Sequence, residues 1–148
     1  MATQWTAGTT AGQILTSATL NTIGAVWVDY TPTLTQGVAV TKTTSYARYC
    51  QIQTLIVVEI FLIATSAGTA ANGVRVGLPV TAKNTGQLLG SGLIYDASTN
   101  TMYNTLPYAF SSSIAAFYYQ TGSEFGVSPA VTLANTDQIR LKFTYEAL

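Results

Sequence analysis

Few side chains in this sequence are capable of acid–base or nucleophilic chemistry. Histidine is absent, and Cys50 is the single cysteine. The carboxylates are spread along the chain, at Asp29, Glu59, Asp96, Glu124, Asp137 and Glu146. Without histidine, the commonest general base and metal ligand, a Cys–His pair and the usual zinc sites are excluded. Two carboxylates could still meet in space, as in glycosidases, but the sequence favours a protein that is not an enzyme and has no cofactor and no metal.

Glu59 differs from the other carboxylates because it interrupts an apolar segment, Leu55 to Ile63. One interpretation is a carboxylate of a functional site. The other is a structural ion pair with an arginine of an adjacent strand, since a buried charge needs a partner. We favour the ion pair, and the candidate partners are Arg48, Arg75 and Arg140.

Aromatic side chains are concentrated between residues 103 and 119. Aromatic rings stack on sugar faces, and tyrosine is also well suited to protein interfaces. The candidate residues for a subunit interface or a glycan-binding patch are Tyr103, Tyr108, Phe117, Tyr118 and Tyr119. Neighbouring residues of a strand point to opposite faces, so three consecutive aromatic residues predict that both faces of this strand are covered.

The elements that would position these residues are strands. Residues 139–145 alternate strictly, with apolar side chains on one face and Arg140, Lys142 and Thr144 on the other. Residues 55–63 are apolar on both faces, which predicts a core on one side and a neighbouring subunit on the other. Short strands separated by turn residues recur along residues 28–148. This pattern predicts an all-β domain, a jelly-roll-like antiparallel β-sandwich of about eight strands.

Residues 1–27 have a different character and predict an extended N-terminal arm with one short helix. Thr16 is a suitable helix N-cap, Leu15 and Leu20 have the spacing of a hydrophobic staple, and Gly24 is a reasonable end. The apolar side chains of this arm would dock it onto a partner, and they are Trp5, Leu15, Leu20, Ile23 and Trp27.

The composition indicates assembly. Charged residues make up 8% of the chain and hydrophobic residues 48%, whereas a soluble domain usually has about 25% charged residues. We therefore expect much of the surface to be buried against other copies. The six basic residues are scattered and the net charge is zero, which argues against nucleic-acid binding. The longest apolar run, Leu55 to Ala64, is too short to cross a bilayer, so no membrane insertion is expected.

Four stretches resemble tailed-bacteriophage virion structural proteins. They are Trp5–Asn21, the W-V-D-Y-T-P-T-L segment at 27–34, the strand pair at 48–58 and V-R-V-G-L-P-V at 74–80. The sequence departs from the family at Gln53, where glycine is usual. The resemblance implies a jelly-roll-like body that is often trimeric and docks to the particle through its N-terminal segment.

The function implied by this resemblance is that of an oligomeric decoration, fibre or minor tail component. The expected partners are further copies of the chain, as a homotrimer, and capsid or tail proteins. The expected location is the virion, after synthesis in the host cytoplasm. The alternative is a receptor-binding tail tip that recognises host-surface glycans through the aromatic residues.

Overall fold

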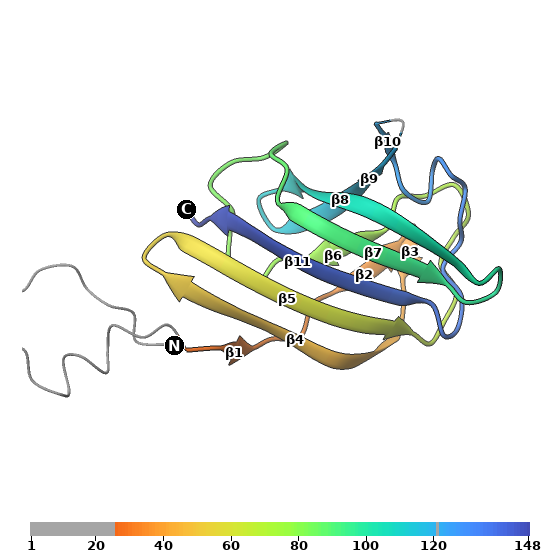
Figure 1. The fold of residues 1–148 in the computed structure, drawn as a ribbon, viewed down its shortest axis with the longest axis horizontal. Helices are drawn as coiled ribbons and strands as arrows, with labels where there is room; N and C mark the ends of the chain where they lie inside the picture. Colours follow the sequence, from red (N-terminus) through yellow and green to blue (C-terminus); the bar gives the residue numbers. More distant parts are fainter. Residues whose placement is uncertain (1–25, 121) are drawn as a thin grey trace, which may run out of the picture.

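The computed structural model describes residues 26–120 and 122–148. These residues form an antiparallel sheet that curls around a core, and they contain no helix (Figure 1). The all-β prediction is thereby confirmed. The expected short helix and four of the arm residues, Trp5, Leu15, Leu20 and Ile23, lie outside the described residues.

The described strands run along the hydrogen-bonded path β1-β4-β5-β11-β7-β8-β9-β6-β2-β3, and β10 pairs with β9. Their bounds are β1 Val28–Asp29, β2 Leu34–Gln36, β3 Val38–Ala39, β4 Lys42–Ile52, β5 Leu55–Ala64, β6 Arg75–Gly77, β7 Gly90–Asp96, β8 Thr101–Ser111, β9 Ile114–Tyr119, β10 Ser123–Glu124 and β11 Gln138–Glu146. Every pairing between these strands is antiparallel.

The broad layer in front of the view in Figure 1 consists of two hairpins with the C-terminal strand between them. β4 and β5 form one hairpin, β7 and β8 form the other, and β11 pairs with both β5 and β7. The alternate residues of β5 that face inward are fully buried, and they are Ile56, Val58, Ile60, Leu62 and Ala64. They pack with the inward residues of β11 in one apolar cluster, because alternation places one complete face of each strand in the core.

β8 connects this layer to the rest of the sheet. Its first half pairs with β7, and its second half pairs with β9 across a register shift between Ala109 and Ser111. From β9 the sheet continues through β6 and β2, which lie behind the front layer (Figure 1). The inward residues Leu34, Val76 and Phe117 of these strands belong to the same core cluster as β5 and β11. The sheet therefore encloses its core by curling.

β7 packs closely against β11 at Gly90. A Cβ atom at this position would lie 2.7 Å from the carbonyl oxygen of Lys142. β7 and β11 are therefore in close contact at this position, with no register shift between them. The register shifts of the sheet lie instead in β4, between Thr44 and Tyr46, and in β8.

A buried glutamine of β2 connects two loops through hydrogen bonds. The side chain of Gln36 in β2 is fully buried. Its Nε2 donates hydrogen bonds to the carbonyl oxygens of Asn72 at 3.1 Å and Val131 at 2.7 Å, and its Oε1 accepts one from the Leu133 N–H at 2.7 Å. One side chain thus satisfies backbone groups of two loops that no strand pairs.

Candidate functional site

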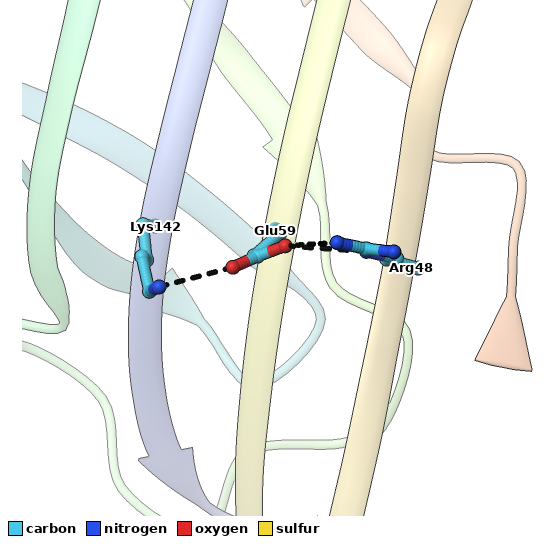
Figure 2. A network of polar contacts seen from close by, with 3 residues as sticks. All are labelled: Arg48, Glu59 and Lys142. Atoms are coloured by element: carbon cyan, nitrogen blue, oxygen red, sulfur yellow. Dashed lines mark hydrogen bonds and ion pairs between the residues drawn. The ribbon is translucent and has the colours of Figure 1, made fainter. Parts of the chain in front are cut away.

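The outer face of β4, β5 and β11 carries a network of charges (Figure 2). Glu59 is the register partner of both Arg48 and Lys142. One carboxylate oxygen, Oε2, accepts a hydrogen bond from Arg48 Nη2 at 2.8 Å, and the other, Oε1, lies 3.0 Å from Lys142 Nζ. The prediction that Glu59 pairs with an arginine of an adjacent strand is confirmed, and the arginine is Arg48.

This network determines the charge state of Glu59. The hydrogen bond from Arg48 lowers the pKa of the Glu59 carboxyl, and Lys142 lowers it further, against an opposing effect of burial. The carboxylate is therefore ionised and fully engaged by two cations. Glu59 has a structural role on the outer face.

Trp27 is the one predicted docking residue among the described residues, and it lies against the same network. The Arg48 guanidinium carbon is 4.6 Å from the centre of the Trp27 ring, a cation–π contact. The side chain remains 40% exposed. Trp27, directly before β1, therefore lies on the outer face of the sheet beside Arg48.

The five aromatic residues predicted from the sequence are divided between the two faces of the sheet. Tyr103 and Tyr119 face inward and pack edge-to-face at 5.5 Å, and both also pack against Phe125. Phe117 is fully buried in the core. These three residues of the predicted set, Tyr103, Phe117 and Tyr119, form part of the inner packing of this body.

Tyr108 and Tyr118 lie together on the opposite, outer face. Their rings stack with centroids 4.0 Å apart and planes 12° from parallel, and Phe110 packs against Tyr108 at 6.3 Å. Burial raises the pKa of Tyr108 to about 12, so its hydroxyl stays protonated at neutral pH. The outer pair forms a rigid aromatic surface.

Arg75 of β6 extends this surface. Its guanidinium carbon lies 3.6 Å from the centre of the Phe110 ring, and its Nε is 3.1 Å from Oε1 of Glu124. The charge of Arg75 is thus balanced by Glu124, and its flat side lies on an aromatic ring.

Apolar side chains surround the stacked tyrosines. Leu106 and Phe110 of β8 are 50% and 41% exposed, and Leu88, which is 61% exposed, forms a backbone bridge with Tyr108. We call Leu88, Leu106, Tyr108, Phe110 and Tyr118 the β8–β9 outer face. Leu88, Leu106 and Phe110 were not among the predicted site residues. The alternation of Leu106, Tyr108 and Phe110 is the sequence signal that could have identified two of them.

Two shallow hollows lie beside this face. Their volumes are about 310 and about 320 Å³, and both are lined by Ser91, Gly92 and Asn104. The first also contacts Tyr46, Arg140 and Lys142, and the second contacts Leu106, Tyr118 and Gln120. The first hollow combines an amide and two cations with an aromatic ring, and the second combines two amides with an aromatic ring. Such groups can bind a polar ligand.

The carboxylates of Asp96 and Asp137 are occupied by structural contacts. Both oxygens of Asp137 accept backbone N–H groups, from Ala97 and Ala134, each at 2.8 Å, and the Asp96 carboxylate accepts bonds from Ser98 and Thr99. Within residues 26–120 and 122–148, no group of three His, Cys, Asp or Glu side chains could hold a metal ion.

No family model matches the chain, and no match was found among curated proteins or among solved structures. In the described part of the chain, no helix has the length and apolar character needed to span a membrane.

Proposed function

We propose that this chain is a structural protein of a phage virion, an oligomeric decoration, fibre or minor tail component. In this role the curled sheet is a stiff, jelly-roll-like body, and residues 1–27 are an arm with a short helix that docks to capsid or tail proteins. The proposed oligomer is a homotrimer, made in the host cytoplasm and incorporated into the virion. The proposed role requires no catalysis and no cofactor.

The observation that carries this proposal is the apolar β8–β9 outer face of the body. Leu88, Leu106 and Phe110 are exposed together around the stacked tyrosines. Contiguous apolar surface on a protein marks an interaction site. The resemblance of residues 5–80 to tailed-phage virion proteins supports the particle as the setting.

The docking part of the proposal is tested in the full chain, with particles of the virus that encodes it. Trp5→Ala combined with Leu20→Ala should reduce the amount of chain that sediments with particles at least tenfold. Ser98→Ala, in the turn after β7, is the control and should sediment like the wild type. Undiminished binding by the double variant would disprove the arm as the docking element.

A second candidate function is recognition of host-surface glycans, which the two hollows favour. Asn104 and Gln120 offer amide groups, and Tyr118 offers a ring beside them; both kinds of group are suited to sugars. Residue Tyr118 is the member of the predicted patch that lines a hollow. A glycan array probed with the wild type and with Tyr118→Ala tests it, because binding through this hollow should be lost in the variant. An array without any binding would contradict this candidate.

A further inference from the structure

We infer that the β8–β9 outer face is covered by other copies of this chain, and that it is the surface through which the oligomer forms. This inference rests on the proposed function, because it names the contact surface of the proposed trimer. It differs from both interfaces expected from the sequence, because Tyr103, Phe117 and Tyr119 face inward and because the outer side of β5 carries the charged Glu59 network.

The first argument is exposure on one continuous face. Leu106 and Phe110 point outward from β8 and are 50% and 41% exposed, and Leu88 beside them is 61% exposed. From Leu106 to Phe110 the strand extends for about 13 Å. The face lies in the middle of the strand path, between β7 and β9, and not at an edge of the sheet. It is therefore suited to face-to-face packing.

The second argument is rigidity. Tyr108 is only 8% exposed because Tyr118 stacks on it, and Phe110 is held between Tyr108 and the Arg75 guanidinium. Aromatic rings that are already fixed lose little conformational freedom when a partner covers them. A hollow of about 320 Å³, lined by Leu106 and Tyr118, lies at the margin and could receive an apolar side chain of a neighbour.

The third argument identifies the occupant by charge. The ionic groups that contact this face, Arg75 and Glu124, are paired with each other at 3.1 Å. The face thus presents no unbalanced charge, and the chain as a whole has net charge zero. Close to the axis of a trimer each residue lies near its own copies, so an unbalanced charge there would meet the same charge. A face whose charges are paired with each other avoids this repulsion. It also has no net charge to attract a strongly charged partner.

The fourth argument is composition. A stable protein interface buries about 800 Å² on each partner. The core of such an interface is apolar and aromatic and lacks unpaired charge. The β8–β9 outer face has this composition and would supply that core.

The test is sedimentation velocity of the full chain between about 1 and 100 µM. We expect the wild type to be a trimer and Leu106→Glu to be a monomer, with association weakened at least a hundredfold. Leu55→Glu is the matched control, because Leu55 is 45% exposed and lies at the distant β4–β5 turn. It should remain a trimer. Leu88→Gln, a milder change on the face, should weaken association at least tenfold, and circular dichroism should show that each variant is folded.

The outcomes separate this inference from the proposed function. A trimer that Leu106→Glu and Leu88→Gln leave intact would overturn the surface assignment, while the trimeric proposal would stand. A wild type that is monomeric at 100 µM would overturn both the surface assignment and the trimeric proposal. The β8–β9 outer face would then bind a different protein. Loss of the trimer in Leu106→Glu, combined with unimpaired particle binding by the arm variants, would support the surface and contradict the docking arm.

Discussion

Arg48 and Glu59 lie directly opposite each other on β4 and β5, and their side chains are joined by a hydrogen bond of 2.8 Å. The Glu59 side chain is 19% exposed, and Lys142 on β11 contacts its second oxygen. One carboxylate therefore joins three neighbouring strands on the outer face. Because two cations satisfy it, it stabilises the fold more than a solitary surface ion pair would.

We predict that Glu59→Gln lowers the free energy of unfolding by about 1 kcal/mol at pH 7. The pKa of Glu59 is lowered chiefly by the hydrogen bond from Arg48, so the native state favours the ionised form. At neutral pH this contribution to stability is fully present. It is lost as the pH falls from the ordinary pKa of glutamate through the lower pKa that Glu59 has in the native state. Urea denaturation of both proteins should therefore show a stability difference that narrows in acid.

Glu146→Gln is the control for this experiment. Glu146 also pairs with a lysine, Lys83, but its side chain is 42% exposed. Solvent screens such a pair, and its removal should cost less than about 0.5 kcal/mol. An equal effect of the two substitutions would show that the network around Glu59 adds nothing to a surface ion pair.

The strands could be predicted from the sequence because their signal is local. Residues 139–145 alternate strictly and lie in β11, Gln138–Glu146, and the apolar run from residue 55 to 63 lies in β5, Leu55–Ala64. β8 is harder to delimit from the sequence, because it continues through Pro107 to Ser111 and proline is uncommon within strands. The order of the strands depends on pairings between distant segments, which alternation within each segment does not encode.

The candidate site was predicted less well, for a related reason. Phe117, Tyr118 and Tyr119 alternate between the two faces of their strand, as strand geometry requires, but which face lies outside depends on how the sheet curls. Only the curvature decides that Phe117 is in the core and that Tyr118 is outside with Leu106. Leu88 joins this face through a backbone bridge to Tyr108, a contact across twenty residues that no short motif indicates.

The turn between β4 and β5 offers a stabilising substitution. Gln53 has a φ of +55°, in the left-handed region that costs a residue with a side chain roughly 1 kcal/mol and that glycine adopts freely. This is the position where the resemblance leads one to expect glycine. Gln53→Gly should raise the free energy of unfolding by about 0.5 kcal/mol, which thermal denaturation can measure as a higher Tm.

Thr54→Gly tests whether this effect comes from the backbone conformation. Thr54 is the other residue of the same two-residue turn, and it does not have a positive φ. Glycine there adds only freedom to the unfolded chain, so it should lower the free energy of unfolding by up to about 1 kcal/mol. If both substitutions changed stability in the same direction, the strain at Gln53 would not be its cause.

Gln36 should be one of the polar side chains to which stability is most sensitive. Gln36→Leu would leave the Leu133 N–H and the carbonyl oxygens of Asn72 and Val131 without their partner. A buried polar group that loses its partner costs about 1–3 kcal/mol, so we expect a loss of about 3 kcal/mol in urea denaturation. Gln51→Leu is the control, because its one bond, to the Gln53 carbonyl, is exposed. A loss below about 1 kcal/mol in Gln36→Leu would show that water replaces these bonds.

Asp137 should show a pH dependence of the opposite sign to Glu59. Burial raises the pKa of the Asp137 carboxyl, which is 1% exposed and lies near Asp96. The native state therefore binds a proton at a pH at which the unfolded chain has released it, so the contribution of this group to stability increases as the pH falls from neutral toward about 4.

Asp137→Asn cannot titrate, and its amide nitrogen would face one of the two backbone N–H groups, of Ala97 and Ala134, that now donate to the carboxylate. It should cost about 1–3 kcal/mol at pH 7, and its deficit relative to the wild type should widen on acidification, whereas that of Glu59→Gln narrows. A deficit that narrowed for both variants would mean that the native state holds Asp137 ionised as firmly as Glu59, and that its two backbone hydrogen bonds outweigh its burial.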